Sequence, residues 1–173
     1  GLRNFHEKNL MDQLLEKLSQ LKKKKNINKP IVIKLSPDIN EKEISMIIEL
    51  IFKYKIDGII ISNTSDTNRE KLVDNKKSEE GGLSGLPIKD LSTQMIKKFY
   101  KEVKKKIPII GVGGVDSGPS AFEKIIAGAT AVQLYTGMVY KGPGIVKEIK
   151  KDLISTLKKE KIKKIGDAVG INA

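Results

Sequence analysis

Pro108-Ile109-Ile110-Gly111-Val112-Gly113 is a short apolar run that leads directly into glycines. Three comparable apolar runs lie at residues 31–35, 59–63 and 131–135. Between them, apolar residues recur at the three- and four-residue spacing of a helix with one buried face. Short, largely apolar strands that alternate with such helices indicate a parallel sheet covered by helices. The sequence therefore predicts an α/β fold made of four βα units.

Helices are predicted over residues 10–21, 44–52, 91–103, 119–127 and 142–157. Two of them have recognisable start signals. Asn40, with Glu43 three residues later, is an expected capping box. The helix that follows is expected to face the core with Ile44, Ile47, Ile48, Ile51 and Phe52. Asp90 is the expected cap of the next helix.

Two architectures fit this order of elements, a doubly wound open sheet and part of a (β/α)8 TIM barrel. The polar and glycine-rich residues all follow the strands, where barrel active sites lie and where such barrels often bind phosphate. A full barrel takes about 250 residues and eight strands. The 173-residue chain is therefore predicted to form the second half of a barrel. Residues 1–173 are expected to have no second domain and to expose two sheet edges.

The composition excludes several kinds of site. The chain has no cysteine and one histidine, His6, which excludes a disulfide framework, thiolate metal ligands and a cysteine nucleophile. His6 is interpreted as a surface residue, and no metal site is expected. No apolar run is near the roughly 20 residues that a membrane span needs. Residues 1–8 contain neither an initiator Met nor a signal-peptide pattern, so we expect the chain to be cut from a longer one.

The formal net charge of +12 comes almost wholly from lysine, because only Arg3 and Arg69 among the 33 basic residues are arginines. Nucleic-acid recognition favours arginine forks and stacked aromatic rings, and aromatic residues make up 5% of the chain. A lysine-rich solvated surface is therefore the favoured interpretation, with no nucleic-acid partner. Coulomb attraction to anionic lipid or nucleic acid is the alternative.

Polar side chains at the ends of the first two strands are candidates for ligand binding. Lys34 lies within an otherwise apolar strand, where a charge is costly without a partner. An anionic ligand would supply that partner, although a lysine that extends into solvent at the strand end is the alternative. Ser62-Asn63-Thr64 closes the second strand. These hydrogen-bonding side chains suit a planar ligand with C=O and N–H groups, or an ordinary turn.

Glycines follow the last two strands. Gly113-Gly114 and Thr136-Gly137 each come directly after a strand. Glycine lets backbone N–H groups approach an anion closely, and helix N-termini add partial positive charge there. The two turns together predict a phosphate cradle, although either alone could be an ordinary βα turn. Leu83 within residues 81–85 indicates a partly packed loop. No side chain suited to proton transfer can be identified from the sequence, so these residues predict an anion-binding half-barrel.

Taken together, these segments match the motifs of one enzyme family. They are Ile33-Lys34-Leu35-Ser36-Pro37-Asp38, residues 57–64, Gly81-Gly82-Leu83-Ser84-Gly85, residues 108–115, residues 128–137 and Lys141-Gly142-Pro143. They resemble the dihydroorotate dehydrogenase family, and specifically its quinone-linked class 2 branch. The resemblance covers nearly the whole chain, in order and with similar spacing.

The resemblance implies an FMN-binding (β/α)8 barrel that oxidises dihydroorotate to orotate in pyrimidine synthesis. It implies that Lys34 faces the flavin ring, where a cation stabilises the reduced flavin. The other FMN contacts that it implies are Ser62, Gly85, Gly114, Tyr135 and Thr136. The last three would surround the phosphate. Asn63 and Thr64 would hold the orotate ring through its carbonyl and amide edge.

The resemblance also leads to expectations about what the chain omits. The class 2 base is a serine on a loop that ends much like Gly1-Leu2-Arg3, so that serine is expected upstream of Gly1. Amino-terminal helices that receive quinone and dock on the bacterial or mitochondrial inner membrane are expected to be missing. The chain alone is expected to be inactive. Two alternatives are a class 1 or other FMN barrel, such as a dihydropyrimidine dehydrogenase domain, and a basic, non-catalytic domain that binds RNA or lipid.

Overall fold

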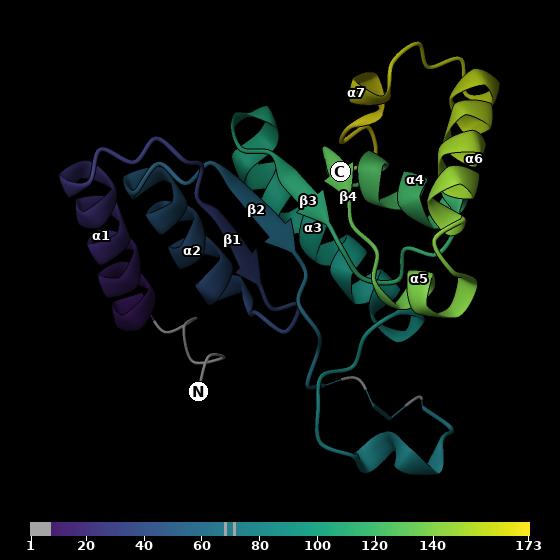
Figure 1. The fold of residues 1–173 in the computed structure, drawn as a ribbon, viewed down its shortest axis with the longest axis horizontal. Helices are drawn as coiled ribbons and strands as arrows, with labels where there is room; N and C mark the ends of the chain where they lie inside the picture. The colour runs from purple at the N-terminus through teal and green to yellow at the C-terminus, as the bar shows by residue number, and fades with distance from the viewer. Residues whose placement is uncertain (1–7, 68, 71) are drawn as a thin grey trace.

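The computed structural model of the chain describes residues 8–67, 69–70 and 72–173 (Figure 1). His6, interpreted above as a surface residue, and the Gly1-Leu2-Arg3 motif lie outside this described part. Among the described helices, none is both long enough and apolar enough to cross a membrane.

Four parallel strands form one sheet in the order β1-β2-β3-β4. The strands are β1 Val32–Leu35, β2 Gly58–Ile61, β3 Ile109–Gly111 and β4 Ala131–Val132. A doubly wound sheet reverses its strand order at a switch point. Here each strand pairs with the next one in sequence, as in a barrel. The strand order therefore favours the half-barrel prediction over the open sheet.

Helices alternate with the strands, as predicted. They are α1 Lys8–Lys24, α2 Glu41–Lys53, α3 Lys89–Val103, α4 Gly118–Ile126, α5 Thr136–Lys141, α6 Ile145–Lys159 and α7 Ile165–Ala168, with 3₁₀ turns η2 Asn75–Ser78, η3 Leu86–Ile88 and η4 Lys104–Lys106. Figure 1 shows α1 and α2 beyond β1 at one side of the sheet, and α4 and α6 beyond β4 at the other. The sequence did not predict α5 and α7, because helices this short show no recognisable period.

Two boundary predictions were wrong. The fourth strand was predicted over residues 131–135, but β4 stops at Val132 and the chain turns through Gln133 into α5. Asp90 was predicted to cap α3. The cap position is Ile88 instead, because η3 runs directly into α3 and leaves Asp90 inside the first helical turn. The predicted capping box of α2 is confirmed, with both reciprocal hydrogen bonds between Asn40 and Glu43.

One face of the sheet is packed against the helices. Ile59, Ile61 and Ile109 are fully buried there, together with helix residues that include Ile47, Ile51, Ile96 and Phe99. The opposite face carries a cross-strand row in which Lys34 pairs with Ile60, Ile60 with Ile110, and Ile110 with Ala131. Side chains alternate between the faces of a strand. The apolar alternation therefore places Lys34 on the face that the helices do not cover.

The core face of α2 differs from its prediction at Leu50 and Phe52. Phe52 was expected in the core but is 43% exposed, while Leu50 is buried at 3% exposure. Ile44, Ile47 and Ile51 are buried as predicted, and Ile48 is partly buried against the same core. Successive helical residues are about 100° apart, so a buried stripe that contains Leu50 and Ile51 leaves Phe52 turned away from the core.

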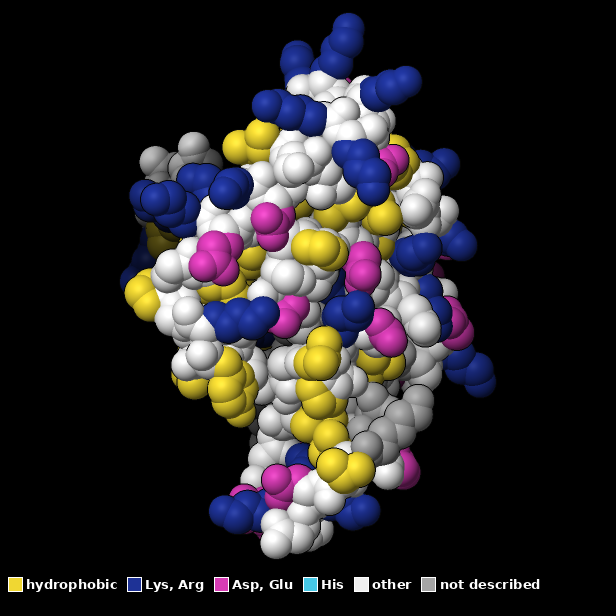
Figure 2. Space-filling model, turned by 90° about the vertical axis from the view of Figure 1, so that its right-hand side faces the viewer, with side chains coloured by type: hydrophobic (Ala, Val, Ile, Leu, Met, Phe, Trp, Pro, Cys, Tyr) yellow, Lys and Arg dark blue, Asp and Glu magenta, His cyan; other side chains and the backbone are white. Residues whose placement is uncertain are grey.

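Lysines gather at the carboxyl ends of the helices. They occupy the last turns of α1 (Lys22, Lys23 and Lys24) and of α6 (Lys158 and Lys159). Cations there interact favourably with the helix dipole. Figure 2 shows lysines at the end of the molecule where α6 ends, and lysines mixed with acidic side chains elsewhere on that face. Because the helices run opposite to the strands, this charge lies away from the carboxyl ends of the strands.

Lys124 of α4 is the one charged side chain buried in the described part of the chain, with 0% exposure. Its Nζ donates hydrogen bonds to Lys89 O and to Thr93 Oγ1, both at 2.7 Å. Burial disfavours the charged form of an amine. It lowers the pKa of Lys124 from 10.5 to about 7.

We expect the free energy of unfolding to rise with pH between about pH 7 and 10.5. The unfolded chain keeps the Lys124 proton up to about pH 10.5 and the folded chain only up to about pH 7. The unfolded state therefore binds more protons in this window, which makes folding more favourable as pH rises. From about pH 7 to 9 the free energy of unfolding should increase by a value on the order of 2 kcal/mol.

Denaturant unfolding of the wild type, Lys124→Met and the exposed-lysine control Lys147→Met measures this effect. Lys124→Met should abolish the increase in the free energy of unfolding with pH, and Lys147→Met should retain it. Parallel pH profiles for all three proteins would contradict the assignment.

Candidate functional site

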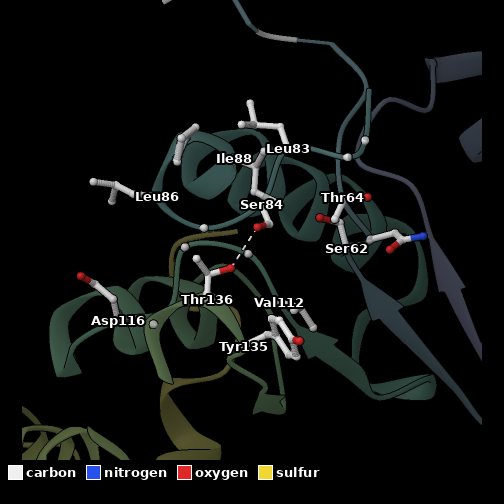
Figure 3. A pocket seen from close by; sticks show the side chains of 18 of the residues that line it. Ser62, Thr64, Leu83, Ser84, Leu86, Ile88, Val112, Asp116, Tyr135 and Thr136 are labelled. Atoms are coloured by element: carbon white, nitrogen blue, oxygen red, sulfur yellow. Dashed lines mark hydrogen bonds between the residues drawn. The ribbon is translucent and has the colours of Figure 1, made fainter. Parts of the chain in front are cut away.

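A cavity of about 970 Å³ opens at the carboxyl ends of the strands (Figure 3). The sequence prediction named eight residues as ligand contacts. The structure places all eight in the lining of this one cavity: Lys34, Ser62, Asn63, Thr64, Gly85, Gly114, Tyr135 and Thr136. They come from five separate segments of the chain, and all but Gly85 lie at or just after the ends of parallel strands, which meet at the same edge of a sheet.

The strands β1 and β2 contribute a cation and a buried hydroxyl. The Lys34 side chain is exposed, and no hydrogen bond or ion pair joins its ammonium to the described residues. Ser62 is 2% exposed, and its Oγ has no hydrogen-bond partner among the described residues. A buried polar atom normally has a partner. The unpaired Ser62 hydroxyl, which faces the cavity with Thr64 (Figure 3), therefore suits a ligand atom.

Asp38 fixes the start of the long connection after β2. Its carboxylate accepts hydrogen bonds from Ser65 Oγ at 2.6 Å, Thr67 Oγ1 at 2.9 Å and Asp66 N at 2.9 Å. Ser65 and Leu83 then exchange two backbone hydrogen bonds, Ser65 N to Leu83 O at 3.0 Å and Leu83 N to Ser65 O at 2.7 Å. These contacts close the loop at its base and hold Thr64 beside the cavity. The half-buried Leu83 confirms the ordered loop predicted from the sequence.

Arg69 organises the outer part of this connection. Its guanidinium donates hydrogen bonds to Lys77 O at 2.8 Å, to Glu79 O at 3.0 Å and to Gly81 O. Five donors in a rigid fork allow one arginine to satisfy several carbonyls. Arg69 and Asp38 were missed in the sequence analysis. The sequence contained a sign of each residue. Arg69 is one of two arginines in the chain and lies in the long loop, and Asp38 directly follows a proline that ends a strand.

Glycines form the opposite end of the cavity. Gly85 and Gly114 have φ angles of +73° and +71°, a conformation that favours glycine. A Cβ at Gly85 would lie 2.9 Å from Thr136 Cγ2, and a Cβ at Gly114 would overlap the side chain of Lys89. Thr136 Oγ1 donates to Ser84 Oγ at 3.0 Å across the cavity (Figure 3). Neighbouring protein atoms therefore leave no room for a side chain at Gly85 or Gly114, although both residues line the cavity.

Asp116 and Lys141 join two walls of this end, and the sequence analysis missed both. Lys141 Nζ donates to Asp116 O at 2.8 Å and to Asp116 Oδ2 at 3.1 Å. Burial raises the pKa of Asp116, but hydrogen bonds from Lys141, Ser117 and Ser120 outweigh it, so that the pKa is lowered. The carboxylate therefore stays ionised and ties α5 to the loop that follows β3.

The cavity thus contains the Lys34 ammonium, the unpaired buried hydroxyl of Ser62 and the amide of Asn63. At its opposite end, the backbone of Gly85 and Gly114 lines it without side chains. Tyr135 lies beside Val112 in Figure 3 and is 79% exposed. In the described part of the chain, no group of three or more His, Cys, Asp or Glu side chains is placed to hold a metal ion. The arrangement can bind an anionic ligand that has a planar hydrogen-bonding part.

The chain is similar to known proteins over almost its whole length. Residues 1–157 match the family model of dihydroorotate dehydrogenase. A relative from Trichodesmium erythraeum, named dihydroorotate dehydrogenase (quinone), is 42% identical over 99% of this chain. A relative of the same name from Buchnera aphidicola is 46% identical over 84% of this chain.

Solved structures show the same likeness. The structure of ligand-free dihydroorotate dehydrogenase from Eimeria tenella matches 99% of this chain with a TM-score of 0.90 and 28% identity. The chain spans about half the length of the proteins that it matches, 46% of the Trichodesmium relative and 52% of the Eimeria chain. The four βα units therefore correspond to about half of a barrel enzyme, as the sequence predicted.

Gly114→Ala tests the glycine end of the cavity. The φ of +71° and the overlap with Lys89 should lower the free energy of unfolding by about 1–3 kcal/mol. Gly144→Ala is the matched control, because its Cβ would meet nothing within 4 Å and its φ is −58°. Its effect should stay within about 0.5 kcal/mol. Denaturant unfolding compares the two, and equal effects would contradict the predicted constraint.

Proposed function

Because the chain belongs to the dihydroorotate dehydrogenase family, we propose that it supplies the carboxy-terminal four βα units of an FMN-dependent barrel. This barrel would oxidise dihydroorotate to orotate and pass the electrons to a quinone. The observation that carries the proposal is the convergence of eight predicted contact residues from five separate segments on one cavity.

The residues of the cavity fit FMN. Gly85 and Gly114 line its glycine end without side chains of their own, and a phosphate needs close approach to backbone N–H groups. Tyr135 and Thr136 would complete the contacts to this phosphate. The unpaired Ser62 hydroxyl would gain the partner that it lacks. When bound, the flavin supplies a two-electron acceptor.

Lys34 would compensate negative charge on the flavin ring. It lies on the sheet face that the helices leave open, and its ammonium has no hydrogen bond or ion pair to the described residues. A fixed cation lowers the energy of charge that develops beside it in a site with little water. Lys34 would therefore bind the flavin and stabilise its negative charge rather than transfer a proton.

Asn63 and Thr64 would orient the substrate. They follow Ser62 directly and line the same cavity, and Thr64 is held by the loop base at Ser65. An amide both donates and accepts hydrogen bonds, which suits the alternating C=O and N–H groups of a pyrimidine ring. The serine base that the family resemblance implies is not among these residues. The proposed share of the described chain in the reaction is therefore to bind and orient.

The names of the relatives support a quinone as the electron acceptor. The relatives from Trichodesmium and Buchnera both carry the quinone-type name, which favours class 2 over the class 1 alternative. A membrane-soluble acceptor implies that the whole protein works at a membrane surface, through parts of the protein other than the helices described here. The lysines that end α1 and α6 interact with the dipoles of their own helices, which favours a solvated surface over RNA or lipid binding for these residues.

The proposed function predicts that the complete barrel purifies as a yellow protein that contains FMN. Dihydroorotate should bleach the flavin absorbance, and a quinone should restore it while orotate forms. The chain of residues 1–173 alone should show no turnover. A colourless complete barrel, or one whose flavin dihydroorotate does not bleach, would contradict the proposal.

Lys34→Ala in the complete barrel should slow flavin reduction by dihydroorotate about 100-fold, because removal of one fixed charge-stabilising group typically costs this much. Stopped-flow absorbance measures the rate. Lys42→Ala, at an exposed lysine in the first turn of α2, is the control and should leave the rate unchanged. A near-normal rate for Lys34→Ala would remove Lys34 from the site.

A further inference from the structure

We infer that the buried Lys124 is a positioning residue that sets the distance between two walls of the cavity. One wall contains Gly85, the other contains Gly113 and Gly114, and Lys124 holds them at the spacing that a phosphate group requires. Lys124 does not line the cavity and would touch no ligand. The inference rests on the proposed function, in which the phosphate of FMN lies between Gly85 and Gly114.

Lys124 joins α4 to the first turn of α3. Its Nζ donates to Lys89 O and Thr93 Oγ1, each at 2.7 Å, and Thr93 Oγ1 in turn donates to Lys89 O at 2.8 Å. A second link runs on the surface, where Lys89 Nζ lies 3.0 Å from Glu123 Oε2. A buried ammonium costs free energy unless hydrogen bonds compensate for it. An apolar side chain would fill this space at lower cost, so packing alone does not explain a lysine here.

The first turn of α3 is in direct contact with the wall that contains Gly113 and Gly114. A Cβ at Gly114 would overlap the side chain of Lys89, and a Cβ at Gly113 would lie 3.1 Å from Ser92 Cβ. The fully buried Ser92 donates from its Oγ to Val112 O. These contacts leave no free space, so a shift of the α3 turn would move the backbone of this wall.

The same turn also places the other wall. Gly85 is the cap residue of η3, and η3 leads without a break into α3. Gly85 faces Thr136, because its Cβ would lie 2.9 Å from Thr136 Cγ2. Lys124 therefore fixes one turn of helix that continues from the Gly85 wall and packs against the Gly114 wall. The distance between Gly85 and Gly114 depends on that turn.

The charged groups around Lys124 leave its hydrogen bonds available in both protonation states. Glu123 on its own helix and Asp90 on α3 favour the ammonium, whereas Lys89 and burial disfavour it. The two acceptors use two protons, which the neutral amine also carries. The positioning contacts are therefore expected to persist on both sides of pH 7.

The test compares the affinities of the complete barrel for FMN and for riboflavin, which lacks the phosphate. Flavin fluorescence quenching gives both dissociation constants for the apoprotein. Lys124→Met keeps the volume but removes both donors. It should reduce the preference for FMN over riboflavin by about tenfold or more, the order of a charge-assisted hydrogen bond, and leave riboflavin affinity unchanged.

Thr93→Val is the second variant, because it removes one acceptor at nearly constant volume. It should reduce the FMN preference by a smaller factor in the same direction. The exposed control Lys147→Met should keep the wild-type preference. Thermal unfolding of the same proteins shows whether each variant is folded.

The outcomes separate this inference from the proposed function. A wild type that binds FMN no better than riboflavin would overturn the proposed phosphate cradle itself. A wild type that prefers FMN, with Lys124→Met and Thr93→Val retaining the same preference, would overturn the positioning role only. Equal loss of affinity for both flavins would assign Lys124 to general stability and would also overturn the positioning role.

Discussion

The parallel pairing of consecutive strands is the constraint on which the rest of the structure depends. Each strand pairs in register with the next one in sequence. Every strand therefore ends at the same edge, and every helix must return along the covered face. As a result, the polar segments that follow the strands meet at that edge. The cavity is a consequence of this pairing.

The pairing also separates the charges of the molecule. Because the helices run opposite to the strands, the lysine-rich ends of α1 and α6 lie at the end of the molecule away from the cavity. The cavity lining combines charges of both signs, which are Lys34 on the open face of the sheet, the Asp116–Lys141 ion pair, and Arg69, Asp74, Lys76, Lys77, Glu79 and Glu80 of the long connection. A net charge of +12 is thus compatible with a small, specific anion site. It need not imply a polyanionic partner.

The stability of the site depends on groups that a ligand would not touch. Asp38 holds the base of the long loop through three hydrogen bonds, and Ser92 and Lys124 hold the first turn of α3. These residues are buried or bonded to backbone groups, so they limit how far the cavity walls can move. A site assembled from loops can keep a defined shape when its supports are this closely packed.

Local sequence signals predicted the alternation of strands and helices, the capping box at Asn40 and six of the eight cavity residues. Those signals are apolar periodicity, a capping pair, a charge in an apolar strand, and polar residues or glycines after strands. Gly85 and Tyr135 were expected only from the family resemblance. The burial of Lys124 and the exposure of Phe52 became apparent only in the folded chain. Burial depends on what other segments lie nearby, and a lysine among many lysines gives no sign of it. The same reason hid the Asp116–Lys141 pair, whose members lie 25 positions apart in sequence.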